Sequence, residues 1–112
     1  MKKPRTKVIY VASPLRGDIE NNLLRAKKYC RKVTKMGFVP IAPHLYFSFL
    51  DDRKTKEREV GMKMGIELLR LCDELWAFGK TSAGMEEEIK VAIKIKIPIK
   101  VFTKSGKYIT LK

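Results

Sequence analysis

The residues with the clearest chemical potential are three consecutive glutamates, Glu86 to Glu88, which open a predicted helix. They follow an apolar strand and a small turn that contains Ser82 and Gly84. A strand that ends in such a turn leaves free backbone N–H groups at the positive end of the helix dipole, where an anion can bind. The turn therefore predicts an anion site formed by Ser82 and Gly84, with a carboxylate close to the bound ligand.

Helical periodicity distinguishes the three glutamates from one another. A period of 3.6 residues directs Glu87 to solvent and places Glu88 next to the buried face, so Glu88 is the best candidate for a carboxylate held against the strand ends. Acids in a first helical turn also occur simply as partners of the dipole, and position alone does not decide between the two roles. The predicted buried face comprises Met85, Ile89, Ala92, Ile93 and Lys96.

A second candidate site lies in the segment Ser13–Asp18, directly after the first apolar run. Arg16 offers a planar fork of donors that suits phosphate, and Gly17 lets the chain turn into the following helix. Together with Ser13 they form a candidate phosphate loop. An ordinary turn with a surface arginine is an equally common explanation.

The third candidate is an aromatic loop that follows the second apolar run. His44, Tyr46, Phe47 and Phe49 fall within six residues, which favours a wall on which a nucleobase stacks. The alternative is that two of these rings plug the core beneath a long loop. Asp51 and Asp52 are interpreted as helix caps rather than metal ligands, because no second His or Cys is near them, and no metal or cofactor is expected.

The pattern of elements predicts how these loops are positioned. Short apolar strands alternate with amphipathic helices, which indicates a three-layer, doubly wound α/β fold of the flavodoxin or Rossmann type, with a mainly parallel sheet of four or five strands in the order 2-1-3-4. Ligands bind outside the carboxyl ends of such strands. The predicted strands are Lys7 to Ala12, Phe38 to Ala42, Glu74 to Phe78, Ile97 to Phe102 and Tyr108 to Leu111, and the predicted helices run from Asp18 to Gly37, Thr55 to Leu71 and Met85 to Lys96.

Composition narrows the class of protein. The 112 residues, 45% of them hydrophobic, predict one domain over residues 1–112. No apolar run is long enough for a signal peptide or a membrane span, so we expect a soluble, cytoplasmic protein without a membrane partner. Cys30 and Cys72 are interpreted as reduced core thiols. The net charge of +13 favours steering of small anions over nucleic-acid binding, because no nucleic-acid motif accompanies it.

Four segments of the chain resemble the nucleoside 2-deoxyribosyltransferase-like superfamily. Within it the similarity is greatest to small, often phage-borne members and more distant to the 2′-deoxynucleoside 5′-monophosphate N-glycosidases. The segments cover almost the whole chain in order and are Tyr10 to Gly17, Pro40 to His44, Cys72 to Trp76 and Ser82 to Glu88.

The resemblance implies a glycosidase or transferase that acts on a 2′-deoxynucleoside or its 5′-monophosphate. It assigns the nucleophile to Glu88, four residues after Gly84, and the residue that positions it to Tyr10. It further implies phosphate binding by Arg16, Gly17 and Ser82, and a homodimer or larger assembly, with apolar contacts from Val60, Met64 and Leu68.

The chain also departs from the family pattern. The second acid of the family is expected near Met64 or Gly65, where no carboxylate stands, and Glu67 is the nearest substitute. Asp73 starts its strand at the opposite edge and is interpreted as structural. A nucleotide-binding protein without activity, such as a sensor or sponge, is therefore the alternative hypothesis, and a basic nucleic-acid-binding protein is the less favoured one.

Overall fold

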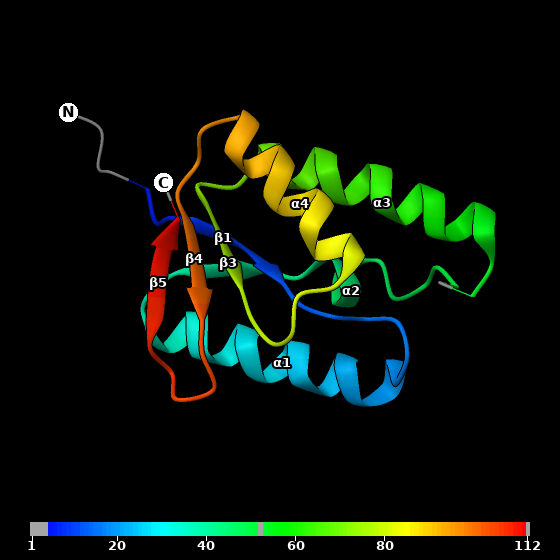
Figure 1. Cartoon of the computed structure of the whole chain (residues 1–112), viewed down its shortest axis with the longest axis horizontal. Helices are drawn as coiled ribbons and strands as arrows, with labels where there is room; N and C mark the ends of the chain where they lie inside the picture. The colour runs from blue at the N-terminus through cyan, green and yellow to red at the C-terminus, as the bar shows by residue number, and fades with distance from the viewer. Residues whose placement is uncertain (1–4, 52, 112) are drawn as a thin grey trace.

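The computed structural model describes residues 5–51 and 53–111, and its elements alternate along the chain (Figure 1). Asp52, one of the two predicted caps, lies outside the described residues. The strands are β1 (Val8–Ala12), β2 (Val39–Ile41), β3 (Glu74–Ala77), β4 (Ile99–Phe102) and β5 (Tyr108–Leu111). The helices are α1 (Ile19–Lys35), α2 (Pro43–Tyr46), α3 (Thr55–Arg70) and α4 (Ala83–Lys94).

The strands form one sheet in the order β2-β1-β3-β4-β5. The first four are parallel, and β5 pairs with β4 in the antiparallel direction through a short hairpin. The predicted α/β class, the mainly parallel sheet and the strand order are therefore confirmed. Because β1 and β3 are central neighbours, the loops that follow them leave the same edge of the sheet side by side.

The side chains of the central strands alternate between two cores, as the pleat of a strand requires. On the α1 side, Ile9 and Val11 of β1 pack with Trp76 and Phe78. On the side covered by α3 and α4, Tyr10 packs with other buried residues of the sheet and of both helices. Figure 1 shows this arrangement, with α1 below the sheet and α3 and α4 above it. The fold thus directs Tyr10 toward α3 and α4.

Local signals account for most of the element boundaries. Asp18 is the N-cap of α1 and accepts a hydrogen bond from the Asn21 backbone N–H, and Gly37 follows the helix with a φ of +92°, as predicted. The segment predicted as a loop after β2 contains instead the short helix α2, for which Pro43 supplies a compatible first residue. Asp51 is not a helix cap: α3 begins at Thr55 after Lys54, and no side chain caps it.

The predicted phase of α4 is only partly correct. Met85, Glu88 and Ala92 are the buried residues, while Ile93, assigned to the buried face, is 54% exposed. The buried residues of α4 are therefore spaced three and four positions apart, and Glu88 is one of them rather than a neighbour of the buried face. Glu87 is exposed, as predicted.

The outer side of α3 was predicted to contribute contacts to a dimer. Val60 and Met64 are exposed, whereas Leu68 packs partly against the core of the chain. Assembly through this helix stays a prediction. Among the described residues, no helix combines the length and the apolar character that crossing a membrane requires.

Candidate functional site

A buried carboxylate and a buried phenol meet at the carboxyl edge of the sheet. Tyr10 lies in β1 and is fully buried, and its hydroxyl donates a hydrogen bond to Oε2 of Glu88, in the second turn of α4. Glu88 is only 7% exposed. Two residues that are 78 positions apart in sequence therefore form one polar pair inside an otherwise apolar core.

Burial changes the protonation of both groups. It raises the pKa of Glu88 from 4.5 to about 7, and the hydrogen bond from Tyr10 opposes this only in part. Burial and the neighbouring carboxylate raise the pKa of Tyr10 well above its ordinary value, so the phenol keeps its proton. A carboxyl group with a pKa near neutrality in a cleft is typical of catalytic sites, although structural networks also produce such shifts.

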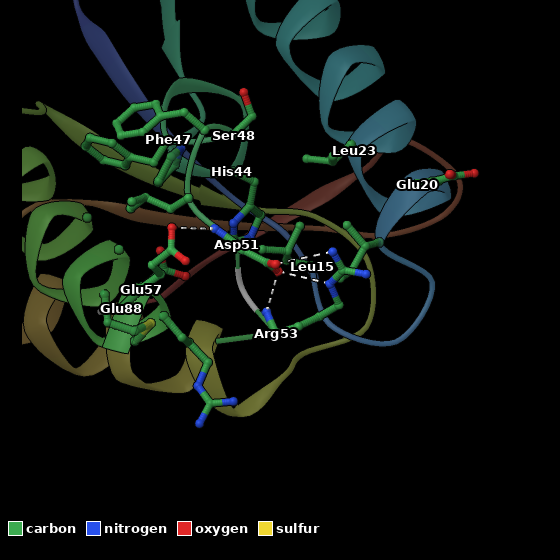
Figure 2. A pocket seen from close by; sticks show the side chains of 18 of the residues that line it. Leu15, Glu20, Leu23, His44, Phe47, Ser48, Asp51, Arg53, Glu57 and Glu88 are labelled. Carbon is green, nitrogen blue, oxygen red and sulfur yellow. Dashed lines mark hydrogen bonds and ion pairs between the residues drawn. The ribbon is translucent and has the colours of Figure 1, made fainter. Parts of the chain in front are cut away.

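The pair lies at a pocket of about 490 Å³. Figure 2 shows side chains from several segments around it. The start of α1 contributes Ile19, Glu20 and Leu23, and the loop before it contributes Leu15. The chain from α2 toward α3 and one side of α3 supply the remaining walls, with Pro43, His44, Phe47, Ser48, Phe49, Leu50, Asp51, Arg53, Glu57, Arg58, Gly61, Met62 and Gly65.

Gly65 on α3 makes room for the pair. A methyl group at this position would lie 3.2 Å from the Tyr10 hydroxyl, which is closer than most such contacts in proteins. The family resemblance expects a carboxylate near Met64 or Gly65. At Gly65 the wall that α3 presents to the Tyr10 hydroxyl has no side chain.

Charged residues of the α2–α3 region also line the pocket, and sequence reasoning did not identify them as site residues. Oε1 of Glu57 accepts a hydrogen bond from the Asp51 backbone N–H, and Nζ of Lys54 lies 3.7 Å from its other oxygen. The carboxylate of Asp51 accepts hydrogen bonds from the backbone and guanidinium of Arg53. The Arg53 side chain keeps the pKa of Asp51 below its ordinary value. The i, i+4 spacing of Glu57, Gly61 and Gly65 is the one signal that could have placed Glu57 on the pocket side of α3.

The structure brings four of the predicted site residues together at the pocket: Tyr10, His44, Phe47 and Glu88. His44 approaches the Ser13 carbonyl oxygen through Nε2 at 2.6 Å, which connects the α2 segment to the end of β1. Phe49, also from the aromatic loop, lines the pocket although it is 72% exposed. Tyr46 does not line the pocket and contacts Phe47 edge to face.

The predicted phosphate residues lie beside the pocket rather than in its lining. Arg16 and Gly17 are exposed in the loop before α1, one and two residues after the pocket residue Leu15. Ser13 is buried, and its hydroxyl has no hydrogen-bond partner among the described residues. Ser82 is the N-cap of α4 and accepts the Met85 N–H, and Gly84 lies in the first turn of the same helix.

Glu67 cannot replace the missing acid from its observed position. Its side chain is 76% exposed, lies 3.9 Å from Arg70 and does not line the pocket. In residues 5–51 and 53–111, no three His, Cys, Asp or Glu side chains lie close enough together to bind a metal ion.

Comparisons with known proteins agree with this fold. A 2-deoxyribosyltransferase from Bacillus psychrosaccharolyticus aligns with a TM-score of 0.70 and 19% identity, over 91% of this chain and 76% of its own. A 2-deoxyribosyltransferase from Leishmania mexicana aligns with a TM-score of 0.61 and 20% identity, and the alignment covers 86% of this chain and 63% of the Leishmania chain. A conserved protein from Enterococcus faecalis V583 aligns with a TM-score of 0.67 and 20% identity, and the alignment covers 90% of this chain and 66% of the Enterococcus chain. At this identity the similarity shows a shared fold.

Parts of these solved proteins have no counterpart in the chain, which spans less than two thirds of the Leishmania protein. No curated protein matches the sequence. The model of one family, described as a domain of unknown function (DUF7768), matches residues 7–102, which include all elements except β5. The chain is therefore a member of the DUF7768 family, with the fold of the nucleoside 2-deoxyribosyltransferases.

Proposed function

We propose that this protein cleaves or transfers the N-glycosidic bond of a 2′-deoxynucleoside or its 5′-monophosphate, with Glu88 as the nucleophile. The observation that carries the proposal is the position of Glu88, buried at a pocket and hydrogen-bonded to Tyr10 at the carboxyl edge of the sheet. The shared fold with two 2-deoxyribosyltransferases supports it.

The proposed reaction has two steps. A carboxylate oxygen of Glu88 forms a bond to C1′ while the C1′–N bond breaks, and the electron pair leaves with the base, which takes up a proton. Water or a second base then attacks C1′ and loses a proton to the group that protonated the first base, and the Glu88 carboxylate leaves. Tyr10 holds the reacting carboxylate in one orientation, while Phe47 and His44 provide the wall for the base.

Only the ionised form of Glu88 can attack C1′. Burial raises the pKa of this group to about 7. We therefore expect kcat/KM, which reports on ionisation of the free enzyme, to rise with pH and to level off above neutrality. A second ionisable residue near the leaving base is needed to supply its proton. Glu57 is the candidate for this role that the pocket offers from α3.

The direct test is release of free base from the four 2′-deoxynucleosides and their monophosphates, followed by chromatography. Glu88→Gln keeps the volume of the side chain but cannot attack, so we expect turnover to fall by several powers of ten. Glu87→Gln is the matched control, since Glu87 is exposed on the same turn and forms a surface ion pair with Lys90. Equal activity in wild type and Glu88→Gln, or a large loss in Glu87→Gln, would refute the assignment.

The covalent step has its own readout. Wild-type protein that is mixed with substrate and quenched rapidly should gain the mass of one deoxyribosyl group, and Glu88→Gln should not. A wild-type protein that turns over substrate without ever carrying this mass would contradict the two-step route and favour direct displacement by water.

Binding without catalysis is the second candidate function. It is favoured by Gly65, which lies in the region where the family resemblance expects an acid, and by the outward position of Glu67. Calorimetric binding of a deoxynucleotide, with no base released by the same sample, would establish this function in place of the first.

Recognition of a 5′-phosphate by Arg16 stays a prediction. A hydrogen bond to a charged group contributes roughly 1.5 to 3 kcal/mol, so Arg16→Ala should weaken a deoxynucleoside monophosphate about ten- to a hundredfold. The unphosphorylated nucleoside should bind as before. An equal loss of affinity for both ligands, or no loss for either, would show that Arg16 does not bind the 5′-phosphate.

A further inference from the structure

The two helical layers of the molecule differ sharply in charge. Helix α1 carries six cationic side chains and one carboxylate, whereas α3 and α4 together carry six of each. The cations of α1 all lie in its last eleven residues, after the single acid Glu20. They are Arg25, Lys27, Lys28, Arg31, Lys32 and Lys35.

Helical phase directs this charge away from the sheet. Asn22, Ala26 and Val33 form the buried side of α1. Lys28, Arg31 and Lys35 project from the opposite side, and all three are exposed. From Arg25 to Lys35 the helix extends about 15 Å, so the cations form a continuous basic stripe.

The cations of the stripe form no salt bridge within residues 5–51 and 53–111. None of the six lies within ion-pair distance of a carboxylate in the described part of the chain, and Arg25 donates instead to the side-chain oxygen of Asn22. In contrast, acids of α3 and α4 pair with neighbouring cations, as Glu67 does with Arg70 and Glu87 with Lys90.

A second element extends the same surface. Nζ of Lys32 donates to the carbonyl oxygen of Gly106 at 3.4 Å, which holds the β4–β5 turn against the second half of α1. Figure 1 shows this turn beside the helix. Lys104 and Lys107 of the turn are exposed, and the sequence contains no acid after Glu88. The "α1 basic face" is defined here as the stripe on α1 together with Lys104 and Lys107.

We propose that the α1 basic face binds the sugar-phosphate backbone of duplex nucleic acid without sequence preference. A row of cations without a salt bridge in the described part of the chain can displace the counterions of a polyphosphate, which is the main source of such affinity. An anionic membrane fits less well, because membrane anchoring uses an apolar helix face and that of α1 is buried against the sheet. Single strands usually need exposed aromatic rings for stacking. Tyr46 and Phe49 lie in the α2–α3 region, and the half-exposed ring of Tyr108, next to Lys107, already packs against Phe102 and Lys100.

The proposal is independent of the proposed glycosidic reaction, and its test uses binding alone. Fluorescence anisotropy of a labelled duplex is measured at several salt concentrations with wild type and with the triple variant Lys28→Gln/Arg31→Gln/Lys35→Gln. The control triple variant Lys56→Gln/Lys63→Gln/Lys94→Gln removes the same charge from exposed positions of α3 and α4. Circular dichroism confirms that both variants keep their helices.

We expect the α1 variant to lose at least tenfold in affinity at low salt. Its slope of log K against log salt should become shallower by about 3, since each phosphate contact contributes about 0.9. The affinity of the control variant for the duplex should fall by less than about threefold. Equal losses in both variants would show that total charge alone is responsible and would overturn the proposal.

Two further outcomes are decisive. Amide chemical shifts of the wild-type protein titrated with duplex should change in α1 and in the β4–β5 turn, and changes confined to α3 and α4 would overturn the proposal. Sedimentation with vesicles of equal parts phosphatidylcholine and phosphatidylserine should show no binding at physiological salt. Binding to these vesicles with none to the duplex would assign the surface to a membrane instead.

Discussion

The two ends of the sheet each bury one glutamate, and the two carboxylates have opposite surroundings. Glu74 begins β3 at the amino edge and is 5% exposed, and Glu88 lies at the carboxyl edge with similar burial. Both leave water on folding and both incur the same kind of desolvation cost. The difference between them is the number of groups that compensate for that cost.

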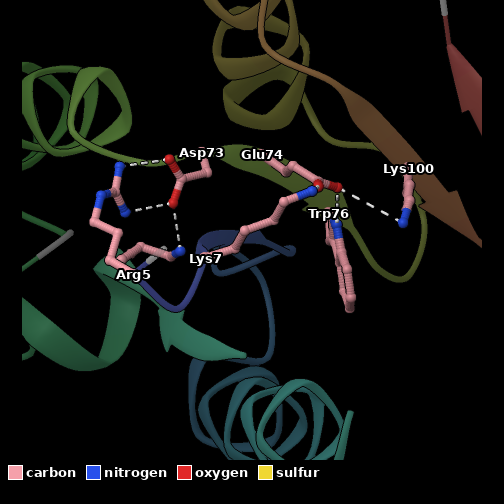
Figure 3. Close-up of polar contacts among 7 residues, drawn as sticks. Arg5, Lys7, Asp73, Glu74, Trp76 and Lys100 are labelled. Atoms are coloured by element: carbon pink, nitrogen blue, oxygen red, sulfur yellow. Dashed lines mark hydrogen bonds and ion pairs between the residues drawn. The ribbon is translucent and has the colours of Figure 1, made fainter. Parts of the chain in front are cut away.

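Glu74 is fully compensated, as Figure 3 shows. It accepts hydrogen bonds from Trp76 Nε1 and Lys7 Nζ, and Lys100 Nζ lies 3.7 Å away. Burial raises the pKa of this carboxyl, but these donors and charges outweigh it, and the net pKa lies below the ordinary value. The adjacent Asp73 accepts from Arg5 and from the Val8 backbone N–H, the structural role that its position in the sequence predicts.

Glu88, in contrast, has one hydrogen-bond donor among the described residues, the Tyr10 hydroxyl, and its pKa is raised to about 7. A carboxylate whose charge is poorly compensated is destabilising for the fold and available for chemistry. The opposite pKa shifts therefore separate Glu74, a glutamate of the framework, from Glu88, the glutamate that we propose for the site.

The largest expected loss of stability is at the amino edge. Glu74→Gln removes the charge that faces Lys7, Lys100 and the Trp76 indole N–H. Because the Lys7 side chain is 57% exposed and can return to water, we expect a loss of about 1.5 to 3 kcal/mol, the contribution of one hydrogen bond to a charged group. Chemical denaturation at pH 7 should show a loss of this size. A loss below about 1 kcal/mol would mean that the cluster is not needed for the framework.

Glu88→Gln should increase the free energy of unfolding at alkaline pH, the opposite of the loss expected for Glu74→Gln. The folded state binds a proton at Glu88 up to about pH 7, whereas the unfolded chain releases it near 4.5, so wild-type stability falls as pH rises between these values. Above pH 8 the ionised Glu88 lowers the free energy of unfolding by about 3 kcal/mol, and the Gln variant does not incur this loss. Denaturation curves should therefore coincide near pH 4.5 and separate at pH 8. A variant that is less stable than wild type at pH 8 would contradict this.

Tyr10→Phe should have a smaller effect and one that depends on pH. The Tyr10 hydroxyl lowers the pKa of Glu88, so its removal should raise that pKa further and move the alkaline rise of turnover to higher pH. At pH 7 we expect turnover to fall about tenfold, the equivalent of one hydrogen bond to a charged group. An unchanged pH profile would show that Tyr10 only fills space.

Much of the framework could be predicted from local sequence patterns. The alternating apolar runs predicted the strands and their order, and Asp18 and Gly37 predicted both ends of α1. Periodicity also singled out Glu88, because three successive acids on one turn cannot all face solvent. Local patterns carry this information because strand pleat and helical period depend only on neighbours in the chain.

The rest of the site depends on packing between distant segments. Gly65 and Glu57 reach the pocket because α3 crosses the sheet near Tyr10, and no local pattern specifies that crossing. Ile93 was assigned to the buried face because periodicity does not reveal which part of that face a neighbouring helix covers. Asp51 was interpreted as a cap, since its pairing with Arg53 depends on the path of the loop.

The most direct test of the comparison is a carboxyl titration of both glutamates in one sample. Carbon-13 spectra of side-chain carboxyls, assigned with Glu74→Gln and Glu88→Gln, should give a midpoint near pH 7 for Glu88. Glu74 should titrate below its ordinary value of 4.5 in the same spectra. Midpoints below 4.5 for both residues would contradict the account, because Glu88 would then be as well compensated as Glu74.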